Sequence, residues 1–332
     1  MRIENDVKLD FDDVLIRPKR SDAPSRKNVV LERTFKMLHS NNTLTCIPIC
    51  ASNFDTIGSM EMAWSLEKQN LLCCLHKFYK PWQLVSFFSR ETSRNTFYTL
   101  GLKENDFEKL VTVNRSISLK MICLDAANGN TQFFVQRVKQ LRDMHKDAII
   151  MVGNTCVPEM VQELLLSGAD IVKIGIGPGS VCTTRLMTGC GYPQLSAVIE
   201  CADSAHGLGG LICADGGCRT PGDLAKAFGG GADILMLGEM LAGADECEGE
   251  WTEGGLKFYG MSSKEAQELH GNGVSLYAAA EGKCIIIPRK GLVENIVNEI
   301  LGSLRSSCTY IGTEQLKSFS KCTTFVRVNR IK

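Results

Sequence analysis

The residues best suited to chemistry lie in one short stretch, GIGPGSVCTTR, at positions 175–185. Ser180 can donate a hydrogen bond to a phosphate, and the thiol of Cys182 can act as a nucleophile. Arg185 follows three residues later, and a neighbouring cation favours the reactive thiolate. The stretch comes directly after the apolar run DIVKI, so we expect Cys182 on an accessible loop at the end of a strand. A flexible loop with an incidental cysteine is the less favoured alternative.

The glycines of this stretch form neither of the two common nucleotide-binding motifs. A dinucleotide fingerprint needs Gly-x-Gly-x-x-Gly/Ala opening a helix, but Ser180 stands at the last position, Pro178 interrupts the motif and no helix is expected to follow. A P-loop needs Gly-Lys-Ser/Thr, which is absent. We expect instead a loop from about Gly177 to Pro193. Ordered loops of that length are usually functional.

Polar side chains also follow other apolar runs along the chain. These residues are Asn53, Asp55, His76, Lys77, Asp125, Asn128, Asn154, Asp215 and Glu239. Any one of them could be a helix cap or a turn residue, which is the commoner role. Their repetition at the ends of successive runs favours a functional site where those ends meet.

The elements that must position these residues form a regular alternation. Eight apolar runs predict strands at 46–52, 71–75, 96–101, 121–127, 148–154, 170–175, 211–217 and 233–239. Helical patterns separate the later runs, and Pro158, Pro193 and Pro221 fit helix starts. Nearly continuous apolar strands that alternate with helices indicate a parallel sheet, and eight of them close a barrel. We predict an α/β protein with one (β/α)8 TIM barrel domain over residues 1–332. An open doubly wound sheet is the alternative, and a helix at 291–305 precedes the polar tail.

Composition excludes several other classes of protein. Lys and Arg together number 37, as do Asp and Glu, so no overall charge attracts nucleic acid or an anionic membrane. No apolar run approaches the roughly 18 residues of a membrane span, and the N-terminus has no signal-like segment. The fifteen cysteines are scattered, without a Cys-x-x-Cys pair, so neither a zinc site nor a disulfide framework is indicated. We expect a cytoplasmic protein that binds neither nucleic acid nor membranes.

Taken together, the motifs resemble the IMP dehydrogenase/GMP reductase family. The resemblance is carried by GIGPGSVCTTR and TGCGYPQLSAV, with DGG and MLGEMLAG on the next two strands. It extends to NDVKLDFDDVLIRPKR, FYGMSS, AAAEGK and LGSLRSSCTYIG, which are similar to the reductase branch, and it covers essentially the whole chain. The chain has no room for the regulatory insertion usual in the dehydrogenases. The segment between Glu248 and Gly282 is also too short for their catalytic flap.

This resemblance implies that the protein reduces GMP with NADPH to IMP and releases ammonia. Cys182 would be the nucleophile at the purine C2 atom, with Thr184 and Glu281 as the catalytic proton relay. A soft nucleophile at C2 divides deamination and hydride transfer into two easier steps through a covalent thioimidate. Ammonia leaves only when protonated, so an acid/base group must lie nearby.

The resemblance also implies sites for each ligand and a homotetramer. The GMP-binding residues would be Ser180, Asp215, Gly217, Gly238, Glu239, Gly260, Met261, Ser262, Ala280 and Gly282. NADPH would contact Lys77, Asp125, Ala126 and Ala127, together with Ser25, Arg26, Ser306, Ser307, Cys308 and Thr309 of a neighbouring subunit. A monovalent cation, K⁺, would be bound by Gly177, Gly179, Cys182 and Arg185.

Two departures from the family pattern keep other functions open. Glu239 stands where the family usually has glycine beside the phosphate, and a carboxylate there would repel a dianion. Ala278 stands where many reductases have arginine next to the cofactor. A catalytically weakened nucleotide-binding paralogue is therefore one alternative, and IMP dehydrogenase is a less favoured one. A generic phosphate-binding barrel isomerase or aldolase would explain Asp215 and the glycines but not the cysteine loop.

Overall fold

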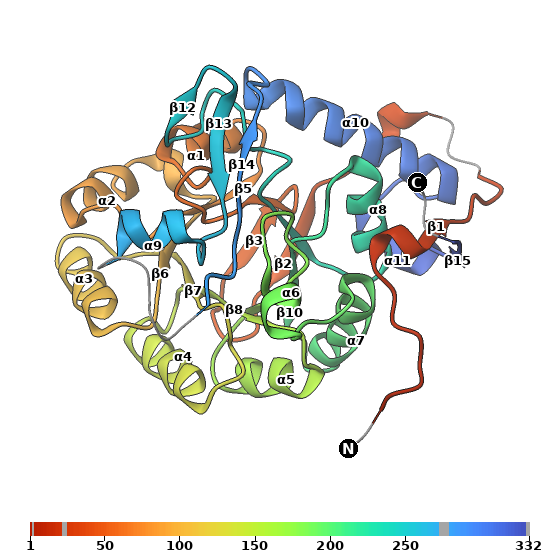
Figure 1. The fold of residues 1–332 in the computed structure, drawn as a ribbon. Coiled ribbons are helices and arrows are strands. Elements are labelled where there is room, and N and C mark those ends of the chain that lie inside the picture. The colour runs from red at the N-terminus through yellow and green to blue at the C-terminus, as the bar shows by residue number, and fades with distance from the viewer. Residues whose placement is uncertain (2, 22–24, 272–278, 330–332) are drawn as a thin grey trace.

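Eight short parallel strands close into a barrel in the computed structural model, which describes residues 1, 3–21, 25–271 and 279–329 (Figure 1). The strands are β4 (Ile49–Ala51), β5 (Leu72–Leu75), β6 (Thr96–Leu100), β7 (Met121–Asp125), β8 (Ile149–Thr155), β9 (Ile171–Ile174), β10 (Leu211–Asp215) and β11 (Ile234–Leu237). Their order around the barrel follows the chain, and β11 pairs with β4 to close it. Each predicted strand exists, so the (β/α)8 TIM barrel is confirmed. The open sheet is excluded.

Helices between the strands cover the outside of the barrel (Figure 1). They are α1 (Met60–Glu67), α2 (Pro81–Phe88), α3 (Glu104–Asn114), α4 (Gln132–Met144), α5 (Pro158–Leu166), α7 (Gln194–Gly207), α8 (Pro221–Gly229) and the long α10 (Val293–Ile311). Pro158 and Pro221 occupy first-turn positions as predicted, and Pro193 is the residue before α7. Proline suits these positions because the first N–H groups of a helix have no partner within it.

Smaller elements surround the barrel. They are the shorter helices α6 (Thr184–Thr188), α9 (Lys264–His270) and α11 (Phe319–Cys322), the 3-10 turns η1 (Phe11–Asp13), η2 (Arg26–Asn28), η3 (Glu91–Ser93) and η4 (Leu316–Ser318), and the strands β1 (Val14–Ile16), β2 (Arg33–Lys36), β3 (Thr43–Cys46), β12 (Trp251–Thr252), β13 (Gly255–Tyr259), β14 (Cys284–Ile287) and β15 (Phe325–Arg327). Strands β1 and β15 pair antiparallel, so the two terminal regions lie side by side. Strands β12, β13 and β14 form a separate antiparallel sheet.

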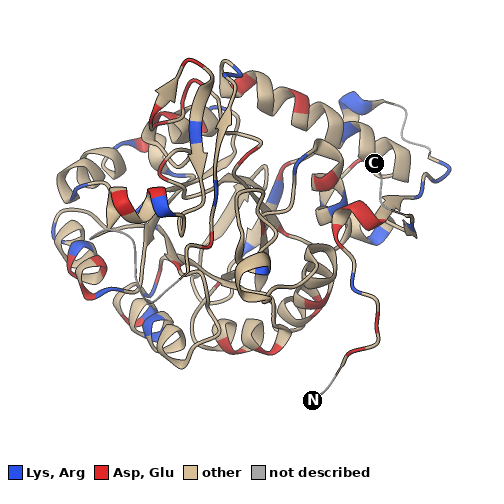
Figure 2. Cartoon of the chain, viewed as in Figure 1, with Lys and Arg blue, Asp and Glu red and all other residues tan. Residues whose placement is uncertain are grey.

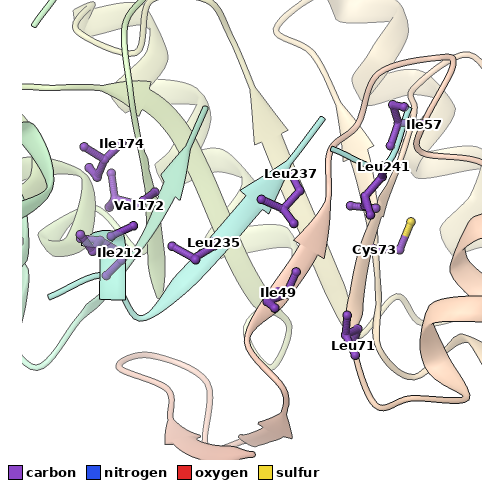
Figure 3. Packing of buried hydrophobic residues seen from close by; sticks show 14 of the residues in the cluster. Ile49, Ile57, Leu71, Cys73, Val172, Ile174, Ile212, Leu235, Leu237 and Leu241 are labelled. Atoms are coloured by element: carbon purple, nitrogen blue, oxygen red, sulfur yellow. The ribbon is translucent and has the colours of Figure 1, made fainter. Parts of the chain in front are cut away.

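Side chains of the barrel strands alternate between two apolar layers. One layer joins strands to helices and contains Val172, Ile174, Ile212, Leu235 and Leu237 (Figure 3). The second layer takes the alternate residues of the strands and fills the barrel lumen, where the β2–β3 hairpin also packs. Each fully buried Leu, Ile or Val contributes about 1.5–3 kcal/mol. This alternation leaves the ends of the strands to carry polar groups.

The structure corrects two boundary predictions. The loop after the glycine-cysteine stretch contains α6, although no helix was expected there. Helix α10 continues to Ile311, six residues beyond the predicted end at 305. That residues 1–332 form one domain stays a prediction.

Two surface properties concern possible partners. Lys and Arg are interspersed with Asp and Glu over the ribbon (Figure 2). Among the described residues, no helix combines the length and the apolar character needed to cross a membrane.

Candidate active site

A cavity of about 300 Å³ lies at the carboxyl ends of the barrel strands. In a barrel of this kind, the loops at these ends carry the chemistry. Of the residues singled out in the sequence, those that line the cavity are Asn53, Lys77, Asp125, Ala126, Ala127, Asn154, Gly177, Gly179, Ser180, Cys182, Thr184, Asp215, Gly217, Gly238, Glu239, Gly260, Met261, Ser262 and Glu281. These predicted residues therefore lie around one cavity in the fold.

Cys182 begins a hydrogen-bonded chain of three side chains. Its thiol donates to the hydroxyl of Thr184 over 3.2 Å, and that hydroxyl donates to Oε2 of Glu281 over 2.6 Å. The thiol is partly exposed to the cavity. The arrangement gives the thiol proton a path to a carboxylate, which is how an adjacent base can generate a thiolate.

Two segments far apart in sequence hold this chain together. Cys182 forms an antiparallel β-bridge with Gly282. The Thr183 N–H donates to the Glu281 carbonyl at 3.1 Å, and the Lys283 N–H donates to the Val181 carbonyl at 2.9 Å. Backbone pairing therefore fixes the position of the carboxylate relative to the thiol.

Arg185 does not contact the thiol, contrary to the expectation that its charge would act there. Its guanidinium donates to Asp10 at 3.0 Å and also to the Tyr192 carbonyl. Asp10 also accepts from the backbone N–H of Gln194 at 2.6 Å. Arg185 thus ties the start of the loop to its end and to the N-terminal segment. The hydroxyl and carboxylate of the relay, rather than this cation, are the groups linked to the sulfur.

Asp215 is the last residue of β10, a strand that follows the Cys182 loop in the chain. Its Oδ2 accepts a hydrogen bond from Asn154 at 3.0 Å, and Nζ of Lys173 lies 3.5 Å from the same oxygen. Gly175 allows the loop to approach here, because a Cβ atom at that position would lie 2.2 Å from the Asp215 carbonyl oxygen. The carboxylate is about one-fifth exposed, which suits an acceptor for hydroxyl groups of a ligand.

Glu239 also lines the cavity and follows β11, the strand that pairs with β10. Nζ of Lys290 donates to the backbone carbonyls of Glu239 at 3.0 Å and Met240 at 3.2 Å. Burial lowers the pKa of Lys290, and the charge of Glu239 partly opposes that shift. A negative side chain therefore lines the cavity where the sequence analysis expected a phosphate.

The β13 strand leads into the residues expected near a base. Gly260, Met261 and Ser262 line the cavity, and the Ser262 carbonyl accepts from the Glu281 N–H at 3.1 Å. Ala280 and Gly282 flank Glu281 but are not among the lining residues. An apolar wall is added by Phe54 and Phe258, whose ring centroids are 5.3 Å apart.

The predicted cofactor residues fall into two groups. Lys77 and Asp125 to Ala127 line the cavity. Ser25, Arg26 and the 306–309 segment lie outside it, where η2 packs against α10. Within that second group the thiol of Cys308 is fully buried, whereas Arg26 is exposed. Ala278, the other residue expected near the cofactor, lies outside the described residues.

Other strand-end residues have structural partners instead. Asp55 is buried and accepts from the Tyr259 hydroxyl at 2.8 Å and from His270 at 2.5 Å. His76 stacks on Tyr79 with ring centroids 4.0 Å apart. Asn128 accepts from the backbone N–H of Asn130 at 3.0 Å. Asn128 thus has a turn role, whereas Asp55 and His76 are held by contacts with other side chains of the fold.

Several residues in and beneath the cavity were not predicted from the sequence. Phe54, Phe258 and Arg219 line the cavity, and Lys173 lies beneath it between two carboxylates. Lys173 could have been noticed, because a lysine in the middle of the apolar run DIVKI is an unusual residue for a buried strand.

Comparisons with known proteins match this chain over nearly its whole length. The model of the IMP dehydrogenase / GMP reductase domain matches residues 8–331. A protein of Yersinia pestis (strain Pestoides F) that is named GMP reductase is 53% identical over 336 residues, covering 99% of this chain and 97% of that protein. A GMP reductase of Yersinia pseudotuberculosis (serotype O:1b, strain IP 31758) matches with the same identity and coverage.

Proposed function

The chain belongs to the IMP dehydrogenase/GMP reductase family, and we propose that it is an NADPH-dependent oxidoreductase that converts GMP to IMP and ammonia. Relatives named GMP reductase that are 53% identical over 99% of the chain support this function. The observation that carries it is the hydrogen-bonded chain from Cys182 through Thr184 to Glu281 at the cavity. A generic barrel isomerase has no use for such a thiol.

The thiol of Cys182 passes its proton through Thr184 to Glu281 and adds to C2 of the purine. The same two residues return a proton to the departing amino group, so that the C2–N bond breaks as ammonia leaves. A thioimidate then links the sulfur to C2. NADPH, when bound, would supply the hydride that C2 takes up. Breaking of the C–S bond releases IMP and leaves a thiolate, which takes up a proton from water to restore the thiol.

The residue roles in the proposed nucleotide site come from the family resemblance, and the lining of the cavity supports them. Asp215 accepts hydrogen bonds from the ribose hydroxyls. Ser180, Gly217, Gly238 and Glu239 lie around the phosphate. Gly260, Met261, Ser262, Ala280 and Gly282 lie along the base. Support comes from the nucleotide-sized cavity and from the placement of all of these except Ala280 and Gly282 on its wall.

The cofactor site is built around Lys77. Its ammonium, beside Asp125, Ala126 and Ala127 on the cavity wall, provides a cation for an anionic cofactor. Ser25, Arg26, Ser306, Ser307, Cys308 and Thr309 complete the site from a neighbouring subunit of a homotetramer. The two segments pack against each other through η2 and α10. This contact supports the proposal that one neighbouring subunit contributes both of them. Because the Cys308 thiol is buried, that residue takes part through its place in the helix.

A K⁺ ion belongs to the proposed site in the catalytic loop. Gly177, Gly179, Cys182 and Arg185 would supply peptide oxygens, the ligands that suit this cation. The loop is already compact, since the Cys182 N–H donates to the Gly179 carbonyl at 3.1 Å. A cytoplasmic location is supported by the fifteen cysteines, which are all free, because disulfides form in oxidising compartments.

The decisive experiment is a turnover assay that follows NADPH absorbance with GMP, in buffers with K⁺ and without it. GMP-dependent oxidation of NADPH, with ammonia and IMP formed in equal amounts, is expected. Absence of turnover in K⁺ buffer contradicts the proposal. Parallel reactions with NADH, and with IMP and NAD⁺, report the cofactor preference and test the dehydrogenase alternative. Calorimetry with GMP and IMP measures binding separately. Binding without turnover would support the alternative suggested by Glu239, a catalytically weakened nucleotide-binding paralogue.

A further inference from the structure

Lys173 is a buried lysine for which the proposed reaction has assigned no role. It occupies β9, and only about 1% of its side chain is exposed. Its neighbours on the strand are apolar, and a buried ammonium is costly unless it is paired. Gly153 leaves room beside it, because a Cβ atom there would lie 2.6 Å from the Cβ of Lys173.

Two carboxylates from different strands share this one ammonium. Nζ of Lys173 contacts Oδ1 of Asp125, at the end of β7, and lies 3.5 Å from Oδ2 of Asp215, at the end of β10. Both carboxylates remain partly exposed, Asp125 by about a third and Asp215 by about a fifth. Their outer sides line the cavity. The ammonium therefore lies behind the walls of two sites, one proposed for ribose and one for the cofactor.

The other titratable groups near Lys173 are thiols. The pKa of Cys74 and of Cys213 is raised well above its usual value, chiefly by burial, and that of Cys123 chiefly by its hydrogen bond with Cys74. These thiols therefore carry no charge at neutral pH. Burial lowers the pKa of Lys173, but Asp125 and Asp215 more than offset it, so the pKa lies well above its usual value and the ammonium stays charged.

The pairing also orients the Asp215 carboxylate. In the described part of the chain, the hydrogen bonds to this group from Asn154 and Lys173 both end on Oδ2. Asn154 is itself fixed by donating to the Gly175 carbonyl at 2.9 Å. Oδ1 is thereby available for a ligand hydroxyl. Without the ammonium, two carboxylates would face one buried space, and the first of them to bind a proton would lose its value as an acceptor.

We propose that Lys173 is a positioning residue that couples the nucleotide and cofactor sites, because its one ammonium balances the charges of the Asp215 and Asp125 carboxylates and keeps both turned toward their ligands. This inference rests on the proposed function, which assigns Asp215 to the ribose and Asp125 to the cofactor. Lys173 contacts neither ligand. Its effect reaches the reaction through the two carboxylates.

The test is the pH dependence of GMP binding, measured by calorimetry in four variants. Lys173→Met removes the ammonium, and Asp125→Asn removes one carboxylate. The double variant Lys173→Met/Asp125→Asn removes one charge of each sign. Lys226→Met is the matched control, since Lys226 is another buried lysine with a carboxylate partner, Asp223, but does not line the cavity. Each dissociation constant is divided by that of the wild type at the same pH, which cancels titration of the GMP phosphate itself.

A coupling role makes the Lys173→Met ratio depend on pH. At pH 6 a proton on Asp215 competes with the ribose, and we expect binding about tenfold weaker or more, with most of the loss recovered by pH 8.5. The double variant should show a smaller loss, because the like charge at position 125 is gone. Lys226→Met should give a ratio that does not change with pH. The coupling also predicts a raised KM for NADPH in Lys173→Met.

Three results would decide against the inference. One is a Lys173→Met ratio near one at every pH, and another is a loss that does not vary with pH, as a purely structural role would give. If Lys173→Met does not fold, the double variant is compared with Asp125→Asn, and a pH-independent ratio between these two is the third. Calorimetry reads binding and not turnover. Hence a wild type that binds GMP without reducing it contradicts the proposed activity alone, whereas a wild type that does not bind GMP overturns both.

Discussion

The hydroxyl of Thr184 donates a 2.6 Å hydrogen bond to the carboxylate of Glu281, 97 residues further along the chain. The same hydroxyl accepts from the Cys182 thiol at 3.2 Å. A threonine so placed can receive a proton from one side and give one to the other in a single concerted shift. The pair is therefore suited both to deprotonating the thiol and to protonating a leaving amine, the two proton transfers that the proposed reaction needs.

Replacement of the nucleophile should remove turnover but not binding. We expect Cys182→Ala to lower kcat with GMP and NADPH by about 10⁴-fold or more, as loss of a catalytic nucleophile does, while GMP affinity changes little. Cys190→Ala is the matched control, because Cys190 is an exposed cysteine on the same loop, and it should retain wild-type turnover. Mass spectrometry of acid-quenched reactions should find a purine adduct on Cys182. Turnover in Cys182→Ala would refute the nucleophilic role.

The relay should behave as a unit. Thr184→Val and Glu281→Gln should each lower kcat by about 10²- to 10³-fold, the usual contribution of a positioned acid or base. The double variant should be little worse than the more damaged single variant, because either change already interrupts the path. Thr188→Val serves as the control, since Thr188 lies on α6 but its hydroxyl donates to the Thr184 carbonyl and accepts from the Cys190 N–H, so it is not part of the relay. Multiplicative effects in the double variant would indicate two independent roles instead.

Glu239 should weaken binding of the nucleotide phosphate. Glu239→Gly removes a negative charge from the cavity wall, and two unit charges about 4 Å apart in water interact by about 1 kcal/mol. We expect GMP to bind about fivefold more tightly, with a larger gain at low salt. Guanosine is the control ligand, because it lacks the phosphate and its affinity should not change. An equal gain for guanosine and GMP would place the effect elsewhere.

Much of this site could be predicted because its residues stand next to strong local signals. Apolar runs mark the strands, and a polar residue that ends such a run must lie at one rim of the barrel, as Asp125 and Asp215 do. Cys182 was identifiable from its own stretch of glycines. Glu281 was different. No local pattern links it to Thr184, and its role entered only through the family resemblance.

What could not be predicted depends on contacts between distant segments. Arg185 was expected beside the thiol, but its charge is taken by Asp10 from the N-terminal segment. Lys173 is an unusual residue in an apolar run, but its partners could not be predicted, since the two carboxylates that make its burial possible come from β7 and β10 and meet only when the barrel closes. Asp55 and His76 do lie at strand ends, but they form hydrogen bonds and ion pairs with side chains from residues 248–270.

A buried ion pair at the amino end of β9, away from the cavity, should matter for stability and not for the reaction. Asp170 is fully buried and accepts from Arg142 at 2.7 Å, from the His39 N–H at 2.8 Å and from the Ile150 N–H at 3.0 Å. Asp170→Ala should lower the free energy of unfolding by about 3–5 kcal/mol, because these donors remain buried without an acceptor. Denaturant unfolding measures the change. Asp143→Asn, at an exposed position on α4, should shift it by less than about 0.5 kcal/mol.

His206 should give stability a small dependence on pH. It lies in the last turn of α7, and Nε2 is 2.8 Å from Oδ2 of Asp233. That hydrogen bond raises the pKa of His206 above the ordinary value of 6.5, although burial acts in the opposite direction. A raised pKa means that the stabilisation is fully present below pH 6.5 and is lost as the pH rises through the folded-state value. The His206→Gln variant should therefore be less stable than the wild type at pH 6 and closer to it at pH 8.5.

The size of that difference should be modest, because the His206 side chain is 45% exposed and solvent screens the pair, which limits it to less than about 1 kcal/mol. Paired urea titrations at the two pH values measure it directly. Asp233 is held in place independently by Arg33 at 3.1 Å and by the Ile212 N–H at 3.1 Å, so loss of the imidazole does not free the carboxylate. A deficit of equal size at both pH values would show that the histidine stabilises the fold by packing and not by its charge.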